Sequence, residues 1–133
     1  MDKLGVFLNF NGNCAEVLDF YGKVFDTAVD MMTKYGDAPA DSQVPGFEDK
    51  IMHSEMVIGG ERLMLADMPP QHPRVEGNNF SMSYHSNDFN KLRRIFDGLS
   101  EGGTVRMPMQ KTFFSEFYGM VTDKFGITWN VIA

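Results

Sequence analysis

The stretch YGMVTDKFGITWNVIA, residues 118–133, decides the fold of this chain. It predicts two strands joined by a tight turn over Asp123–Gly126. Side chains alternate across a strand, so the second strand has two different sides. One side takes Ile127, Trp129 and Val131, and the other takes Thr128, Asn130 and Ile132. The amide of Asn130 therefore interrupts an apolar strand, and its role bears on what the protein does.

The residues before this hairpin complete a module of one strand, one helix and three further strands. Residues 79–85 predict the first strand. Apolar side chains then recur at helical spacing from Phe89 to Leu99, and Gly102-Gly103 ends that helix. A strand over Thr104–Met109 precedes the closing hairpin.

The first half of the chain repeats this plan. Residues 4–10 predict a strand and 13–25 an amphipathic helix, in which Asn13 and Glu16 have the form of a capping box. A weaker strand over 27–34 and two strands over 50–58 and 62–67, around the turn Gly59-Gly60, follow. A proline-rich loop over 69–78 links the halves. We expect one α+β domain of two β-α-β-β-β modules, about 1–68 and 75–133, whose sheets form one cup-like curved mixed sheet.

Composition narrows the functional classes. The chain has 133 residues, 43% of them hydrophobic, and a formal net charge of −6. An acidic chain without a basic cluster argues against binding nucleic acid. No apolar run reaches the length of a membrane span, and the polar residues Asn9 and Asn11 argue against a signal peptide. We therefore expect a cytoplasmic protein that does not associate with a membrane. We also expect Cys14, the single cysteine, to be a buried structural thiol.

Four stretches carry a resemblance to a known family: NFNGNCAEVLDFYGKVF (9–25), IGGERLMLAD (58–67), NNFSMSY (78–84) and GMVTDKFGITWNV (119–131). In combination they resemble the PhnB-like branch of the glyoxalase/bleomycin-resistance, or vicinal oxygen chelate, superfamily. Some members of that branch are labelled 3-demethylubiquinone-9 3-methyltransferase. The resemblance implies the cup-like fold and a homodimer. A methyltransferase usually needs a glycine-rich strand-to-helix turn, whereas both glycine pairs here lie elsewhere.

Metal-using members of the superfamily hold a divalent ion with four His, Gln or Glu ligands from the first and last strand of each half. The resemblance places neutral residues at these positions: Asn130, Asn79, Met64 or Leu65, and one residue of 6–9. Amides and thioethers are poor ligands for hard divalent ions. We therefore expect no standard metal site and no cofactor. Asn130 then either recognises a polar group of a ligand or satisfies a buried backbone group.

His53 and Glu55 lie two residues apart on a strand, so both side chains point to the same face. Facing the cup, they would act as base and acid or bind a metal from a new position. The alternative is a polar pair that faces solvent or a dimer partner. His72, in the proline-rich loop, and His85, at a strand end, are interpreted as surface residues.

The aromatic stretch KTFFSEFYG (111–119) precedes the last hairpin, and in PhnB-like proteins the corresponding segment lies at the cup. It supplies candidates for a stacking wall. The full set of candidate substrate-binding residues is Asn9, Met64, Asn79, Ser81, Phe113, Phe114, Tyr118 and Asn130.

Three functions follow from these candidates. The first is a protein that binds a small molecule without a standard metal site. The second is a divergent metal-dependent lyase, isomerase or dioxygenase that uses His53 and Glu55. The third is a protein whose pocket has lost its function and whose role is association.

Overall fold

The computed structural model describes all 133 residues and contains the expected plan twice. The chain divides into two compact units, Met1–Val75 and Glu76–Ala133, here called module 1 and module 2. Each module has the order strand, helix and three strands, and each strand set forms one four-stranded sheet. The α+β class and the doubled β-α-β-β-β plan are thus confirmed.

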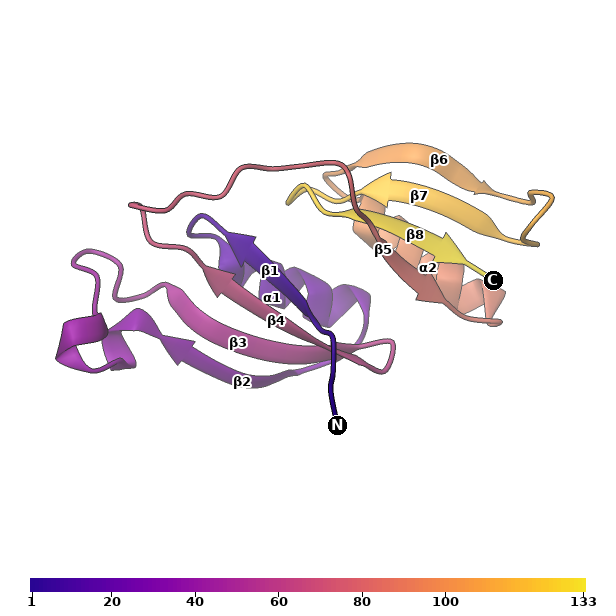
Figure 1. Cartoon of the computed structure of the whole chain (residues 1–133). Helices are drawn as coiled ribbons and strands as arrows, with labels where there is room; N and C mark the ends of the chain where they lie inside the picture. The colour runs from indigo at the N-terminus through magenta and orange to yellow at the C-terminus, as the bar shows by residue number, and fades with distance from the viewer. The chain divides into compact units, whose positions relative to one another are not determined.

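Module 1 is a mixed sheet with one helix along one face (Figure 1). Its sheet has the order β1-β4-β3-β2, in which β1 runs parallel to β4 and the other pairs are antiparallel. Both glycines of the β3–β4 turn, Gly59 and Gly60, have positive φ (58° and 81°), as a tight hairpin requires. The elements are β1 (Val6–Phe10), α1 (Cys14–Val24), β2 (Val29–Lys34), two short 3-10 helices (Tyr35–Asp37 and Ala40–Ser42), β3 (Ile51–Ile58) and β4 (Glu61–Asp67).

Module 2 repeats this topology with the order β5-β8-β7-β6, and β5 runs parallel to β8 (Figure 1). Its first strand is shorter than expected: it begins at Met82, so residues 79–81 lead into the sheet from outside it. The elements are β5 (Met82–His85), α2 (Phe89–Ser100), β6 (Thr104–Gln110), β7 (Tyr118–Thr122) and β8 (Thr128–Ile132). Neither helix is both long enough and apolar enough to cross a membrane.

Each sheet has one face covered by its helix and one open face. In β8 the expected alternation holds, because Trp129 and Val131 are buried while Asn130 is half-buried on the other side. In β3 four side chains are buried, those of Ile51, Ser54, Met56 and Ile58, and the last three alternate with His53, Glu55 and Val57. The helix-side faces form the apolar cores, so the open faces are where polar side chains gather without disturbing the core.

The expected capping box at the start of α1 is wrong. Asn13 does occupy the N-cap position, but its side chain makes no capping hydrogen bond. The carboxylate of Asp67, at the end of β4, takes that role: Oδ1 accepts the backbone N–H groups of Gly12 and Cys14, each at 2.9 Å. Its Oδ2 accepts the N–H of Ile51 at 3.0 Å, so one buried carboxylate joins α1, β3 and β4.

Module 2 uses a buried carboxylate in a similar way. Asp123 Oδ1 accepts the backbone N–H groups of Phe125 and Ile127 at 2.9 and 3.1 Å, which shapes the β7–β8 turn. Its Oδ2 accepts the indole N–H of Trp129 at 3.0 Å. The Asp-x-Phe-Gly turn seen in the sequence is therefore held by its aspartate.

Asp67→Ala would leave three backbone N–H groups of module 1 without their acceptor. Each unsatisfied buried donor costs about 1–3 kcal/mol, so we expect a loss of roughly 3 kcal/mol or more in the free energy of unfolding. Urea denaturation followed by circular dichroism measures this loss. Asp41→Ala, which removes an exposed carboxylate, is the matched control and should change the free energy by less than about 0.5 kcal/mol. A similar small effect for Asp67→Ala would contradict the assigned role.

Candidate functional site

The sequence-predicted site residues fall into two groups, one on each module. Module 1 carries Asn9, His53, Glu55 and Met64. Module 2 carries the other six, which are Asn79, Ser81, Phe113, Phe114, Tyr118 and Asn130.

Asn130 is the centre of a hydrogen-bonded chain on the open face of module 2. The hydroxyl of Tyr118, on the neighbouring strand β7, donates to Asn130 Oδ1 at 2.7 Å. The amide nitrogen of Asn130 lies 2.7 Å from the hydroxyl oxygen of Ser81 and 3.5 Å from that of Ser83. The Asn130 amide thus forms hydrogen bonds with side chains on its own face. None of these contacts supports the alternative in which the amide satisfies a buried backbone group.

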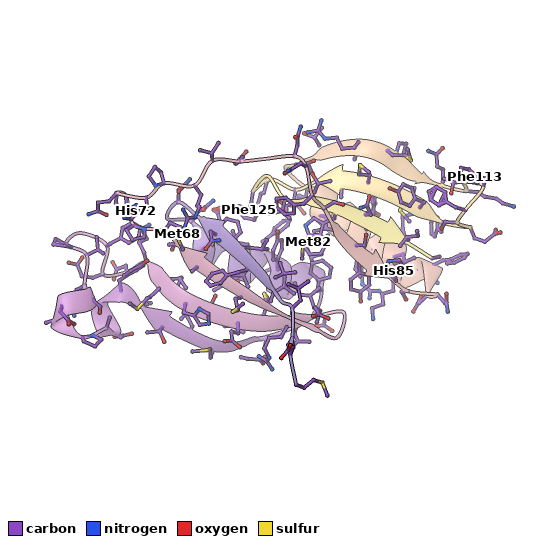
Figure 2. The ribbon with its side chains drawn as sticks, viewed as in Figure 1. Met68, His72, Met82, His85, Phe113 and Phe125 are labelled. Atoms are coloured by element: carbon purple, nitrogen blue, oxygen red, sulfur yellow. The ribbon has the colours of Figure 1, made fainter.

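The aromatic residues extend this chain toward the β6–β7 loop. The rings of Phe114 and Tyr118 meet edge to face with centroids 5.1 Å apart, and Phe113 meets Phe114 in the same way at 5.2 Å. Phe114 is 54% exposed, and Phe113, labelled in Figure 2 at the loop between β6 and β7, is fully exposed. Large apolar rings left in solvent beside a polar group are typical of a binding surface.

The loop that carries these rings is held from below by Ser115. This serine is buried, and its hydroxyl lies 2.9 Å from the backbone carbonyl of Ala133. Its N–H donates to the hydroxyl of Thr112 at 3.1 Å, which closes the loop on itself. The exposed rings therefore stand on a backbone that is fixed before any ligand arrives, which lowers the entropy lost on binding.

Sequence reasoning missed Ser83 and Met120 as neighbours of Asn130, and Met107 as the neighbour of Met120. Strand pairing places Ser83 and Met120 directly beside Asn130, and Met107 beside Met120. The period-two pattern would have indicated Ser83, which is two residues from Ser81. The pairing of β6 could not be read in this way because that strand carries register shifts. Asn79 lies in the exposed segment before β5 and makes no contact with this chain of hydrogen bonds.

On module 1, His53 and Glu55 share the open face of the sheet, opposite α1. His53 Nε2 lies 2.9 Å from Glu55 Oε2, and the His53 ring meets Phe7 edge to face at 5.7 Å. Strand pairing puts Met64 beside both Phe7 and Glu55, and Asn9 beside Ala66. The resemblance placed one metal-ligand position of the superfamily at Met64 or Leu65. Met64 lies on the open face, whereas Leu65 is buried on the helix side.

Glu55 belongs to a larger network of charges. Arg62 Nη1 lies 3.4 Å from Glu55 Oε1 and 2.8 Å from Asp30 Oδ2. The hydrogen bond from His53, followed by the charges of His53 and Arg62, lowers the pKa of the Glu55 carboxyl below its ordinary value. Glu55 is therefore ionised near neutral pH, and its negative charge is already matched by a cation.

The residues present do not fit the divalent ion of the metal-using superfamily members. The Asn130 cluster consists of an amide and three hydroxyl groups, and the β4 position holds a thioether, all of them neutral. No three His, Cys, Asp or Glu side chains converge anywhere in the chain in a way that could hold a metal. Hard divalent ions need carboxylate or imidazole ligands that these positions lack.

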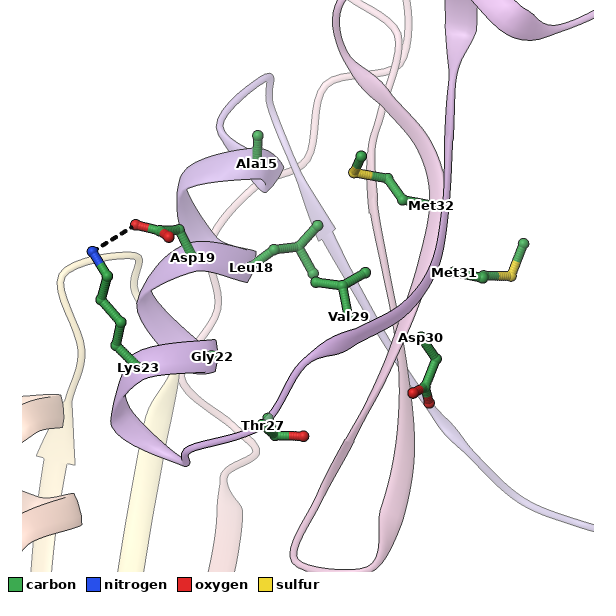
Figure 3. Close-up of a pocket in the computed structure, with 10 residues that line it drawn as sticks. All are labelled: Ala15, Leu18, Asp19, Gly22, Lys23, Thr27, Val29, Asp30, Met31 and Met32. Atoms are coloured by element: carbon green, nitrogen blue, oxygen red, sulfur yellow. Dashed lines mark ion pairs between the residues drawn. The ribbon is translucent and has the colours of Figure 1, made fainter.

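A groove in module 1 lies between α1 and β2 (Figure 3). It has a volume of about 590 Å³, and Leu18, Val29 and Met32 form its apolar wall. Two ion pairs lie at its rim: Lys23 pairs with Asp19 at 3.1 Å (Figure 3), and Asp30 pairs with Arg62 at 2.8 Å. The polar side chains that line the groove thus already have partners, since the Thr27 hydroxyl also donates to the carbonyl of Val57. The groove is therefore a weaker candidate for binding than the open faces.

The remaining reactive side chains are structural or exposed. Cys14 is fully buried, as expected, and burial raises the pKa of its thiol to about 12. Such a thiol supplies no nucleophile at neutral pH. His72 and His85 are both exposed (Figure 2), in agreement with their interpretation as surface residues.

Comparison with known proteins decides the family. A family model described as 3-demethylubiquinone-9 3-methyltransferase matches residues 2–132. The chain belongs to this PhnB-like family. Protein YjdN of Escherichia coli (strain K12) is 28% identical over 137 residues, which cover 96% of this chain and 92% of YjdN.

Two solved structures support the same assignment. Protein PA1353 from Pseudomonas aeruginosa is 34% identical, with a TM-score of 0.89 over 99% of this chain and 97% of that one. The PhnB protein from Bacillus cereus is 25% identical, with a TM-score of 0.83 over 98% of each chain. Both have the glyoxalase/bleomycin-resistance fold, so the expected superfamily is confirmed.

The depressed pKa of Glu55 gives a testable pH dependence. The contribution of this carboxylate to stability is present above its ordinary pKa of 4.5 and is lost as the pH falls through the lower folded-state value. A carboxyl titration by ¹³C NMR should place the Glu55 midpoint below 4.5. His53→Gln should move that midpoint upward, whereas His85→Gln should leave it unchanged. An unmoved midpoint in His53→Gln would show that His53 does not set this pKa.

The raised pKa of Cys14 predicts a thiol that is protected in the folded state. At about pH 8, Ellman's reagent should label the native protein at least ~100-fold more slowly than the urea-unfolded chain, because reaction requires opening of the fold. The neutral thiol favours folding below its ordinary pKa of 9.0, and this contribution is lost as the pH rises toward about 12. Rapid labelling of the folded protein would contradict the burial assigned to Cys14.

Proposed function

We propose that the protein binds a small planar molecule on the open face of module 2, without a metal ion at the positions that metal-using relatives occupy. The observation that carries this proposal is the chain from Tyr118 through Asn130 to Ser81, with contacts of 2.7 Å on each side. An amide held in this way presents a fixed donor and acceptor at a surface that a ligand can reach. Its supports are side chains rather than the backbone ladder, so they can exchange partners when a ligand arrives.

The surroundings favour a ligand with a flat apolar part. Phe114 and Tyr118 form a corner of two aromatic rings beside the amide, and Met107 and Met120 continue the surface on the neighbouring strands. Aromatic rings bind flat groups by stacking, and methionine adapts to irregular shapes. The proposed ligand thus has a planar ring over these side chains and a hydrogen-bonding group at Asn130.

The runner-up function is a metal-dependent enzyme that uses His53 and Glu55. Their 2.9 Å contact on the open face of module 1 favours it, since a histidine and a carboxylate in contact can transfer a proton. Arg62 argues against a metal at this place, because its positive charge lies 3.4 Å from the carboxylate that would bind the ion. The pair therefore supports proton transfer better than metal binding.

Benzamide is a suitable first probe, because it joins a planar ring to one amide. In ¹H–¹⁵N NMR titrations we expect it to shift signals of Asn130, Tyr118 and Phe114. Asn130→Ala should weaken binding about 5- to 10-fold through the lost hydrogen bonds. Asn90→Ala, which removes an exposed amide from α2, should bind benzamide as the original chain does. Shifts that avoid the open face, or equal affinity in both variants, would overturn the proposal.

The ring of the probe tests the aromatic corner separately. Phe114→Ala should weaken benzamide binding about 5-fold, in line with the value of an aromatic contact. Cyclohexanecarboxamide has the same amide on a ring that cannot stack. It should bind more weakly than benzamide, and its affinity should respond less to Phe114→Ala; an equal response would show that stacking contributes nothing.

Metal analysis tests the runner-up directly. After incubation with manganese, iron, nickel, zinc and magnesium salts and desalting, we expect less than about 0.1 equivalent of bound ion, since the neutral ligand positions lack charge. A stoichiometric ion that is lost in His53→Ala or Glu55→Ala would instead establish the metal enzyme.

A further inference from the structure

A second polar chain crosses the open face of module 2, one side-chain repeat away from Asn130. Arg106 Nε donates to the hydroxyl of Thr122 at 3.1 Å, and this hydroxyl lies 2.8 Å from that of Thr128. Thr122 and Thr128 are paired across β7 and β8, two positions along from the pair Met120 and Asn130. Two residues of a strand span about 7 Å, so a small molecule can reach both polar chains.

A bulge in β6 places Arg106 in this chain. Val105 pairs with Val121 and Met107 pairs with Met120, so Arg106 is one extra residue between two successive pairs. A bulge changes the direction of a side chain, and here it brings the guanidinium to Thr122 on the open face. Arg106 takes part in no ion pair, and Thr122 holds only its Nε. The two terminal nitrogens remain for a carboxylate, which a guanidinium binds in a bidentate manner.

A groove of about 360 Å³ beside this arginine also contains a carboxylate. Glu76 and Asn78 line it together with Arg106, Thr122 and Thr128. The Glu76 carboxylate lies so close over Gly126 that a side-chain carbon there would be 2.8 Å from its carboxyl carbon. Glu76, like Arg106, takes part in no ion pair. One groove thus holds a positive and a negative group that do not neutralise each other.

We propose that this groove binds the charged end of an α-amino acid, with the carboxylate at Arg106 and the ammonium at Glu76. A purely anionic ligand would meet the repulsion of Glu76, and a purely cationic one that of Arg106. A zwitterion satisfies both, and the hydroxyls of Thr122 and Thr128 supply the remaining hydrogen bonds. This inference names the ligand class for the proposed function, on which it rests, because the side chain of the amino acid would extend over Met120 toward Asn130.

Three probes with the same ring separate the two charges. L-phenylalanine carries both, 3-phenylpropanoate lacks the ammonium, and 2-phenylethylamine lacks the carboxylate. In NMR titrations we expect L-phenylalanine to bind about 5-fold or more tightly than either analogue, as a partly exposed ion pair would give. Equal affinity of the three probes would overturn the proposal.

Two variants test the assignment of each charge. Arg106→Gln should abolish the advantage of L-phenylalanine over 2-phenylethylamine, and Glu76→Gln should abolish its advantage over 3-phenylpropanoate. Arg94→Gln and Glu101→Gln change one exposed charge each on α2 and at its C-terminal end, and should preserve both advantages. An advantage that survives in both groove variants would place the recognition elsewhere and overturn the proposal.

The benzamide titration separates failure of this inference from failure of the proposed function. If benzamide binding depends on Asn130 but L-phenylalanine binds no more tightly than its analogues, the proposed zwitterion site is wrong and the proposed binding face is retained. If the tighter binding of L-phenylalanine depends on Arg106 and Glu76 but Asn130→Ala leaves benzamide affinity unchanged, the groove is retained and the role proposed for Asn130 is wrong. No binding by any of these probes overturns both.

Discussion

A buried aspartate carboxylate that accepts backbone N–H groups is the interaction on which the rest of module 1 depends. The Asp67 carboxylate accepts backbone N–H groups at the start of α1 and at the first residue of β3, and Asp67 is itself the last residue of β4. Its two oxygen atoms thus fix three segments that lie far apart in the chain. Tyr35 adds a fourth segment, because its hydroxyl donates to the carbonyl of Asp67 at 2.7 Å. A carboxylate removed from water is tolerated there because each of its oxygens has a donor.

With the backbone fixed from the helix side, the opposite faces are free to carry chemistry, and the two modules carry different kinds. Module 1 presents a network of His53, Glu55 and Arg62, in which the carboxylate and the guanidinium already have partners. Module 2 presents neutral hydroxyls and amides beside exposed rings, with two charges that have no partner. A surface whose charges are already matched has little electrostatic energy left for a ligand, which is why module 2 is the stronger candidate for binding.

Much of this arrangement could be predicted from local patterns. The period of two placed Asn130 on the face opposite Trp129, and the resemblance to PhnB-like proteins gave the fold. The helix cap was missed because the hydrogen-bond acceptor that caps α1, the Asp67 carboxylate, lies 53 residues beyond Cys14 in the sequence. No local motif spans that separation. The role of Arg106 was missed because a bulge breaks the alternation on which such reasoning relies. The spacing predicted that His53 and Glu55 point to the same face, whereas the participation of Arg62 depends on strand pairing that sequence spacing does not reveal.

The extra residue in β6 also affects how this family can change. Substitutions alter one side chain at a time, but deletion of the extra residue from a bulged strand restores regular pairing while its neighbours keep their partners on the next strand. In this chain, loss of the Arg106 codon would remove both the bulge and the guanidinium, while Val105 and Met107 kept their partners on β7. Under the proposed function, the length of β6 in a relative therefore bears on its ligand as directly as the identity of its residues.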